Sequence, residues 1–339
     1  MSFRWNSVGI AATLLLSCAA LAQSGAGNAA PQSQAPAAPA GQAAPAKPVG
    51  FPPPDQRNFT ASQPTIETVN AFLTAQIGFD PNRIWQVEAI QKTMAPGYSD
   101  VTVLLADKSN PSQQQPARFL VTPDQKFIVQ GSTIVPFGAK PFADIRKMLE
   151  EKAHGAARGS DSKSLLLVEF SDLECPHCKE AQATIDKLLK DYPQARFVYE
   201  NYPIDQIHPW AQKAAQYGVC VGEHGSDAFY KFVQNVFDAQ DQITPENADE
   251  KLKAAATSAG VDGSQTAACA ATSEAKSRVA ESKELAQLVG VTSTPTLFVN
   301  GRSLPIGQQI PYETLKTIIN YQAQLDGVKV SPSLNSLSK

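Results

Sequence analysis

The motif Cys-Pro-His-Cys, residues 175–178, limits what this chain can fold into more than any other feature. It follows a short apolar run, Leu165–Phe170, which is typical of a buried strand in a mostly parallel sheet. Pro176 stands where a first-turn proline costs no hydrogen bond. After the motif, apolar residues recur at helical spacing, at Ala181, Ile185, Leu188 and Leu189. The sequence therefore predicts a strand followed by a helix that begins at the motif.

Two cysteines at the start of a helix predict redox chemistry. Unpaired backbone N–H groups and the helix dipole favour an anion there, so the pKa of Cys175 is expected to be lowered. Cys178 lies one turn further on and can close a small disulfide ring with Cys175. A zinc half-site is the alternative, but it needs two more ligands, and the chain has no second C-x-x-C and no H-x-x-H pair. A purely structural disulfide is disfavoured, because so short a loop removes little chain entropy.

The N-terminus has the pattern of an exported protein. Residues 1–22 combine Arg4, an apolar stretch at Ile10–Leu16 and the small-residue sequence Ala20-Leu21-Ala22 of a signal-peptidase site. The same region looks like a lipobox that ends at Cys18, which would make Cys18 a lipidated first residue. The alternative is that Cys18 is discarded with the signal peptide. We therefore expect a periplasmic or otherwise extracytoplasmic protein, with lipid anchoring through Cys18 left open.

Two further segments precede the motif. Residues 23–57 are rich in Ala, Pro, Gln and Gly and have almost no large apolar side chain, which predicts a disordered linker. Residues 58–154 predict a small α+β domain with a helix at Thr65–Ile77 and a connector helix at Phe142–Lys152. Its expected strands are Ile84–Ile90, Val101–Ala106, Ala117–Val121 and Phe127–Val129. The unit contains no cysteine. Its role is open between plain packing and dimerisation or partner binding.

The motif itself belongs to a second unit, residues 160–325, followed by a C-terminal tail at 326–339. After the first strand and helix, its expected elements are a strand at Arg196–Tyr202, a mostly helical insertion at about 208–288, a strand at Thr296–Val299 turned by Asn300-Gly301, and a helix at Tyr312–Tyr321. This order predicts an α/β protein. The fold class is thioredoxin-like with a helical insertion, preceded by the small α+β domain.

Three stretches, FSDLECPHC, HPWAQKAA and TSTPTLFVNG, carry a resemblance to a known family. They resemble the DsbA-like thioredoxin-fold family of exported bacterial thiol:disulfide oxidoreductases. The resemblance covers residues 160–325, about half of the chain. The preceding domain and connector helix are loosely similar to the layout of dimeric disulfide isomerases. The resemblance implies no organic cofactor, protein substrates with cysteine thiols or disulfides, and reoxidation by a membrane redox partner.

The resemblance also implies a role for each residue of the motif. Cys175 looks like the exposed nucleophile and Cys178 like the buried resolving thiol, with Pro176 and His177 between them. His177 would donate a hydrogen bond or positive charge to the Cys175 thiolate. Glu169 matches the family's buried acid. Because a carboxylate is costly to bury, Glu169 is expected to be a proton acceptor for Cys178 and not an accident of the core.

Pro295 matches the family's cis-proline and is preceded by Thr294. A cis bond would place the Thr294 backbone beside Cys175, where an extended substrate adds as a strand. The alternative is an ordinary trans proline that opens a strand. The negative charges nearest to the motif, Asp172 and Glu174, would be screened by solvent if they are exposed.

The remaining cysteines and histidines are assigned to structure. Cys220 and Cys269 are an even remainder in an exported protein, which predicts a structural disulfide across the helical insertion. The alternative is two free buried thiols. His208 and His224 are expected to be structural or surface residues.

The function expected from these features is dithiol oxidation, in which a Cys175–Cys178 disulfide exchanges with protein thiols. A net charge of −3, with 18% charged residues and no basic cluster, gives no sign of a nucleic-acid partner. Two alternatives stay open. One is a disulfide isomerase or reductase of the same fold that dimerises through the N-terminal unit. The other is a non-catalytic, chaperone-like binding module in which that unit supplies the function.

Overall fold

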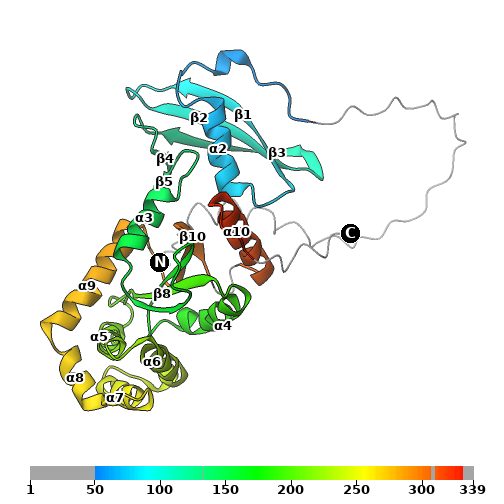
Figure 1. The fold of residues 1–339 in the computed structure, drawn as a ribbon. Coiled ribbons are helices and arrows are strands. Elements are labelled where there is room, and N and C mark those ends of the chain that lie inside the picture. Colours follow the sequence, from blue (N-terminus) through cyan, green and yellow to red (C-terminus); the bar gives the residue numbers. More distant parts are fainter. Residues whose placement is uncertain (1–49, 132, 307–309, 331–339) are drawn as a thin grey trace, which may run out of the picture. The chain divides into compact units, whose positions relative to one another are not determined.

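The computed structural model describes residues 50–131, 133–306 and 310–330 and divides into two compact units between Pro141 and Phe142 (Figure 1). The expected signal peptide at 1–22, with Cys18, lies outside the described residues, as do the linker up to residue 49 and the tail from residue 331. In the part of the chain that is described, no helix is both long and apolar enough to cross a membrane.

The first unit is a helix packed on an antiparallel sheet. A short 3-10 helix, η1 (Gln56–Asn58), precedes α2 (Ile66–Ile77). The strands follow one another in space as they do in the chain, in the order β1 (Arg83–Lys92), β2 (Ser99–Asp107), β3 (Asn110–Val121), β4 (Phe127–Gln130) and β5 (Thr133–Pro136). Val69, Phe72 and Leu73 of α2 share one buried cluster with the inner face of the sheet. The predicted small α+β domain therefore has a hydrophobic core of its own.

Two strands of this unit differ from the predicted ones. β3 begins at Asn110 and not at Ala117. Residues 110–116 contain two prolines and three glutamines and have no strand pattern, yet they pair with the long apolar strand β2. β5 was not predicted, because it is a four-residue strand that pairs with β4 alone. In both places the partner strand, and not the local sequence, decides the structure.

The second unit is built on a mixed five-stranded sheet in the order β10-β9-β7-β8-β6. The strands are β6 (Ala156–Gly159), β7 (Leu165–Ser171), β8 (Ala195–Asn201), β9 (Thr296–Val299) and β10 (Arg302–Pro305). β7 pairs in parallel with β8 and antiparallel with β9, and all of its residues are buried. A strand covered on both faces has a continuous apolar sequence, which explains why the run before the motif was recognisable.

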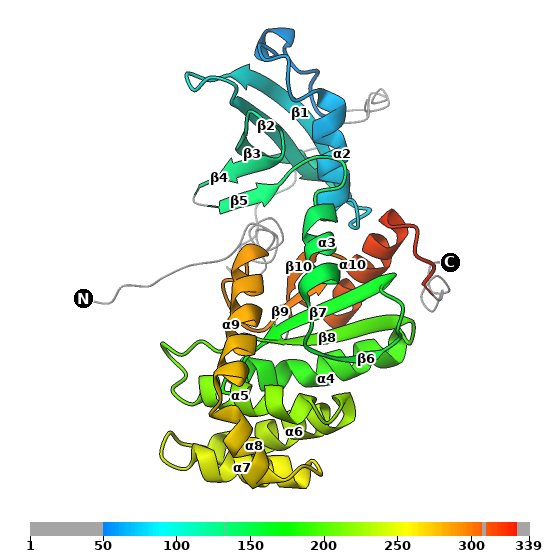
Figure 2. The same cartoon turned by 60° about the vertical axis from the view of Figure 1, so that its left-hand side comes forward.

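Helices cover both faces of this sheet (Figure 2). α3 (Ala143–Lys152) and α9 (Ser273–Leu288) pack on the face that carries Leu166 and Val168 of β7. α4 (Pro176–Asp191) covers the opposite face, which carries Glu169, and α10 (Tyr312–Leu325) lies beside α4. The hydroxyl of Tyr192, at the end of α4, donates to Asn320 of α10 at 2.9 Å. The predicted thioredoxin-like α/β fold is confirmed.

α3 belongs to the second unit, although the sequence had placed residues 142–152 in the first. Its Leu149 is buried in the same cluster as the β7 side chains. Its first turn lies against Gly301, where any side chain would collide with the carbonyl of Phe142. Asn300 and Gly301 both have positive φ, 46° and 87°, so the predicted Asn-Gly hairpin turn is observed. A helical pattern alone could not show which sheet this helix packs on.

The predicted helical insertion fills the chain between β8 and β9. It contains α5 (Ala211–Gly222), α6 (Ser226–Ala239), the short 3-10 helix η2 (Gln240–Gln242), α7 (Ala248–Ser258), α8 (Gly263–Ala270) and then α9. A disulfide joins Cys220 of α5 to Cys269 of α8, with their Cα atoms 6.0 Å apart. The pairing expected from the cysteine count is therefore present in the structure.

Removal of the Cys220–Cys269 disulfide is expected to destabilise the protein. The bond closes a sequence separation of 49 residues, for which the chain-entropy model gives about 4 kcal/mol as an upper value. The paired change Cys220→Ala with Cys269→Ala should lower the free energy of unfolding in urea by roughly 2–4 kcal/mol. The thiolate titration of Cys175 should remain as in the unchanged protein. An unaltered urea midpoint would contradict a stabilising role for this bond.

Candidate active site

The two cysteines of the motif lie where β7 passes into α4. The helix begins at Pro176, and Cys175 is its N-cap residue in an extended backbone conformation. Both cysteines are free thiols. Cys175 keeps 5% of its surface exposed and Cys178 keeps none. Both cysteines are therefore buried, Cys178 completely and Cys175 almost completely, so Cys175 is less exposed than the expected nucleophile.

The environment of Cys175 favours its thiolate. A hydrogen bond from the Cys178 thiol is the largest cause that lowers the pKa of Cys175 to about 5. The backbone N–H groups of Cys178 and His177, at the start of α4, lower it further, whereas burial opposes them. At neutral pH Cys175 is therefore the thiolate of the pair.

The environment of Cys178 favours the opposite state. Burial is the main reason why the pKa of Cys178 lies well above its usual value, and the neighbouring Cys175 raises it further. The Cys178 sulfur accepts a hydrogen bond from the backbone N–H of Asp172 at 3.4 Å. The predicted division into a nucleophile and a resolving thiol requires this difference between the two sulfurs.

Glu169 lies buried beneath α4. Gln182 of that helix donates from Nε2 to the two carboxylate oxygens at 3.3 and 3.5 Å. Burial raises the pKa of Glu169 to about 7. Tyr199 lies opposite Glu169 in the β7–β8 pair, and the hydroxyls of Tyr199 and Ser171 are buried without a hydrogen-bond partner among the described residues. The acid thus belongs to a buried polar cluster, and its charge raises the pKa of nearby Cys178.

Thr294 and Pro295 lie beside the dithiol, although they are distant in sequence. The peptide bond between them is cis, as the family resemblance implies. The carbonyl oxygen of Thr294 lies 3.7 Å from the Cys175 sulfur. β9 begins at the next residue, Thr296. The loop before β9 therefore brings backbone hydrogen-bonding groups to the nucleophile.

His177 differs from what the sequence suggested. Its imidazole is exposed, with Nδ1 3.2 Å from the carboxylate of Glu180 in the next turn of α4. What His177 gives to Cys175 in this structure is its backbone N–H. The reason is geometric, because the first N–H groups of a helix point along the axis toward its start while side chains point outward. The expected donation from the imidazole is not observed.

Asp172 and Glu174 are not exposed, so the condition for solvent screening is not met. Asp172 is only 1% exposed. Its carboxylate accepts from the backbone N–H groups of Glu174 and Ile204, each at 2.8 Å, and lies 2.8 Å from Nδ1 of His208. Glu174 accepts from the backbone N–H of Trp210 at 2.7 Å. Apart from the N–H of Glu174, these groups come from residues 202–210, between β8 and α5, and no local pattern around the motif reveals them.

Two glutamines near the dithiol were missed from the sequence. Gln240 of η2 donates from Nε2 to the carbonyl oxygens of Leu173 and Cys175, at 2.9 and 3.2 Å. Gln182 follows Cys178 by four residues, a helical spacing that would have placed both side chains on one face. Gln240 is too distant in sequence for such a signal. It ties the helical insertion to the backbone of the nucleophile.

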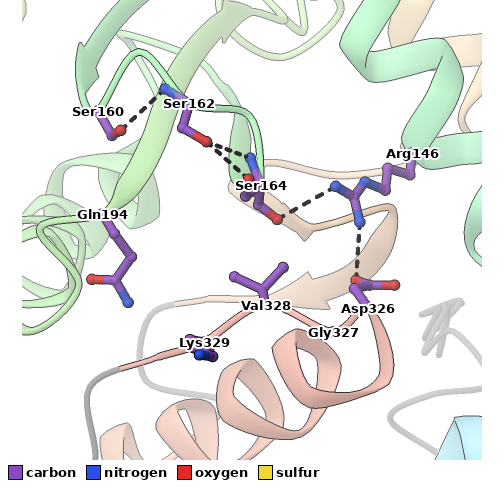
Figure 3. A pocket seen from close by; sticks show the side chains of 9 residues that line it. All are labelled: Arg146, Ser160, Ser162, Ser164, Gln194, Asp326, Gly327, Val328 and Lys329. Atoms are coloured by element: carbon purple, nitrogen blue, oxygen red, sulfur yellow. Dashed lines mark hydrogen bonds and ion pairs between the residues drawn. The ribbon is translucent and has the colours of Figure 1, made fainter.

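A polar hollow of about 440 Å³ lies at the other end of β7 (Figure 3). It is lined by Arg146, Ser160, Ser162, Ser164, Gln194, Asp326, Gly327, Val328 and Lys329. Ser164 precedes β7 and the motif follows it, so the length of the strand separates this hollow from the dithiol. The guanidinium of Arg146 is already paired with Asp326. Neither this hollow nor any other part of the described residues contains a group of three or more His, Cys, Asp or Glu placed to hold a metal ion.

Comparison with known sequences places this site in a family. The family model described as thioredoxin matches residues 151–321, just over half of the chain. The chain belongs to the thioredoxin family. The matched range includes the Cys-Pro-His-Cys motif, the helical insertion and the cis-proline loop, whereas the first unit lies outside it.

The individual relatives match only part of this chain. An antiporter from Salinispora tropica, named Na(+)/H(+) antiporter NhaA 3, is 32% identical over 145 residues, which are 43% of this chain and 21% of the relative. The chain thus spans about a fifth of that relative's length. A probable disulfide bond formation protein D from Bacillus anthracis is 25% identical over 150 residues, 42% of this chain and 68% of the relative. The crystal structure of oxidised BdbD from Bacillus subtilis overlaps with a TM-score of 0.46 at 22% identity, covering 52% of this chain and 95% of that one.

The low pKa of Cys175 is expected to depend more on Cys178 than on the His177 imidazole. Cys178→Ala removes the largest stabilising hydrogen bond and should raise the pKa of Cys175 well above about 5. His177→Ala keeps the backbone N–H and should change the pKa of Cys175 less. Thiolate absorbance of the reduced protein, measured against pH, reports both values, with Cys175→Ser as the blank. A larger effect of His177→Ala would show that the imidazole acts on the thiolate directly.

Glu169 is expected to make the protein less stable as pH rises. The pKa of Glu169 is raised from 4.5 to about 7 on folding, so the stability that its neutral form provides is complete below about 4.5 and is lost as pH rises toward 7. By linkage the loss is on the order of 3 kcal/mol. Glu169→Gln, which cannot ionise, should lose less stability over this interval. Urea unfolding of the disulfide form at several pH values tests this without thiol titration, and parallel curves for both proteins would contradict it.

Proposed function

We propose that this protein is an exported thiol:disulfide oxidoreductase that acts mainly as a dithiol oxidase on protein substrates. The observation that carries the proposal is the unequal pair at the start of α4, in which the pKa of Cys175 is lowered and that of Cys178 is raised. Membership of the thioredoxin family supports thiol–disulfide exchange as the reaction. The Bacillus anthracis relative carries disulfide bond formation in its name.

The proposed reaction begins from the Cys175–Cys178 disulfide. A substrate thiolate attacks the Cys175 sulfur, the internal disulfide breaks, and Cys178 leaves with the electron pair while a mixed disulfide forms. Because Cys178 is buried and favours its neutral form, it takes up a proton, for which buried Glu169, with a pKa of about 7, is the proposed donor. A second substrate thiolate then attacks the substrate sulfur and releases Cys175 as a thiolate. The substrate loses two electrons and the protein gains them.

The stable Cys175 thiolate favours oxidation of the substrate. A dithiol couple becomes more oxidising when its reduced form is stabilised, and a thiolate with a pKa of about 5 is stabilised at neutral pH. The cis-proline loop would hold the substrate, since the carbonyl of Thr294 lies beside Cys175 and an extended peptide can add there as a strand. No organic cofactor or metal is needed for this exchange.

The cellular setting is part of the same proposal. The signal-like sequence at 1–22 would export the chain to the periplasm or another extracytoplasmic space, with a lipid anchor at Cys18 as the alternative to a free mature protein. The reduced dithiol must pass its two electrons on before the next cycle. A membrane redox partner is the proposed acceptor, on the strength of the family resemblance.

The oxidase and isomerase assignments predict different results with one model substrate. Disulfide-form protein should introduce disulfides into reduced, unfolded ribonuclease, and Cys175→Ser should abolish this. If the protein instead fails to oxidise reduced ribonuclease but restores activity to scrambled ribonuclease, the isomerase assignment replaces the oxidase one. A chaperone-like binding module would suppress aggregation equally well with Cys175 or Ser at this position.

One observation favours keeping dimerisation in the proposal. In the first unit, Leu120 lies directly opposite Val129, and Val129 opposite Ile134, so the three side chains share one face of the β3–β4–β5 sheet. Phe127 belongs to the same face by its position in β4. Leu120, Phe127 and Ile134 are exposed, by 38%, 39% and 65%. A second copy of the chain is the proposed cover for this face.

A dimer formed through this face should depend on Ile134. The unchanged protein should scatter light as a dimer at tens of micromolar, and Ile134→Glu should convert it to a monomer because the charge would have to be buried. Ile207→Glu, at another exposed isoleucine in the second unit, should leave the dimer intact. A monodisperse monomer for the unchanged protein would contradict the proposal.

A further inference from the structure

Asp172 occupies an unusual position between the central strand and the nucleophile. Its backbone takes part in the dithiol geometry twice, because its N–H donates to the Cys178 sulfur and its carbonyl accepts from the N–H of Cys175 at 3.1 Å. Its carboxylate is fully buried. A buried negative charge so near a thiolate should raise the pKa of that thiolate unless something compensates it.

The group that meets this carboxylate is His208. Its Nδ1 lies 2.8 Å from Oδ2 of Asp172, and its side chain is 15% exposed. Because an ionised carboxylate only accepts hydrogen bonds, Nδ1 must carry the hydrogen. The ring is held by its own loop, where the N–H of His208 donates to the carbonyl of Ile204 at 3.0 Å, and the N–H of Ile204 donates to the same Asp172 oxygen. Side chain and backbone of residues 202–210 therefore converge on one carboxylate.

We propose that His208 is a positioning residue for the dithiol, which through its hydrogen bond to buried Asp172 offsets the negative charge of that carboxylate and fixes the turn that carries Cys175. This deepens the proposed thiol–disulfide exchange and rests on it. His208 does not touch the reacting sulfurs in the structure. It acts through Asp172, whose backbone bonds reach both cysteines.

The other charges around this pair do not replace His208. Glu174 is bound by the N–H of Trp210 and adds a second carboxylate, whose pKa is raised mainly by burial and lowered by the charge of His208. Lys283 pairs with exposed Asp205 of the same loop at 3.2 Å. Within the described part of the chain, His208 is the base that lies within ion-pair distance of Asp172.

Two substitutions of nearly unchanged shape test the pair. His208→Asn replaces the imidazole by an amide that cannot ionise, and Asp172→Asn removes the negative charge. His224→Asn makes the same change at an exposed histidine and serves as the matched control. For each protein, the thiolate titration of Cys175 and the equilibrium with reduced and oxidised glutathione are measured, and urea unfolding checks the fold.

The proposal predicts effects of opposite sign. His208→Asn should raise the pKa of Cys175 and make the couple more reducing, with the glutathione equilibrium constant falling about tenfold, or about 30 mV. Asp172→Asn should lower the pKa of Cys175 and make the couple more oxidising. The double variant should return close to the unchanged protein, because the two opposite effects cancel. His224→Asn should have no effect.

Two results would overturn the proposal. One is a His208→Asn protein that is folded and titrates like His224→Asn. The other is a shift of the same sign in His208→Asn and Asp172→Asn, which would indicate loosening of the turn and not charge compensation. If Asp172→Asn does not fold, the comparison of His208→Asn with His224→Asn still tests the proposal. If His208→Asn does not fold, an Asp172→Asn protein in which Cys175 titrates as in the unchanged protein overturns it. Both measurements use small thiols, so a failure to oxidise protein substrates would refute the proposed function and leave this inference standing.

Discussion

The chemistry of this site depends on the unequal burial of two sulfurs that lie one helical turn apart. Cys175 faces the first N–H groups of α4 and the Cys178 thiol, whereas Cys178 faces the protein interior beneath the same helix. Burial alone would raise both thiol pKa values. The directional hydrogen bonds at the helix start reverse that effect for one sulfur. In the middle of a helix the backbone N–H groups are already bonded, so neither thiol pKa would be lowered in this way. The strand must therefore end, and the helix begin, at the dithiol.

The three acids around the dithiol show how much the immediate donors matter. Glu169 is buried and accepts from the side chain of one glutamine, Gln182, and burial raises the pKa of Glu169 to about 7. Asp172 is buried as deeply but meets two backbone N–H groups and the imidazole of His208. Glu174 is partly exposed and meets one backbone N–H. A carboxylate with several donors can remain charged in the interior, and one with few is better suited to hold or release a proton near neutral pH.

The elements that are decided by residues close together in the chain could be predicted from the sequence. The apolar run, the helical spacing after it and the Asn-Gly turn predicted β7, α4 and the β9–β10 hairpin, because each is decided by residues close together in the chain. β5 and the first half of β3 were missed because a neighbouring strand imposes their pairing. The cis bond before Pro295 was expected from family resemblance, since no local pattern distinguishes the two isomers.

The site was predicted less completely than the fold for the same physical reason. Cys175, Cys178 and Glu169 lie on two consecutive elements, so spacing brings them together. His208 and Gln240 reach the same turn from segments 30 or more residues away, as backbone and side-chain donors with no periodic signature.

These long-range donors give the helical insertion a role in the site beyond added bulk. Gln240 holds the carbonyl of Cys175, and residues 202–210, which lead into α5, hold Asp172 and Glu174. α5 is in turn fixed to α8 by the Cys220–Cys269 disulfide. This disulfide lies outside the dithiol. It restrains α5, and the loop before α5 surrounds the dithiol. Most of the loop donors are backbone N–H groups, so the path of the chain matters to this site. The side chains of His208 and Gln240 reach the same turn. The insertion therefore contributes to Cys175 both a restrained backbone path and two positioned side chains.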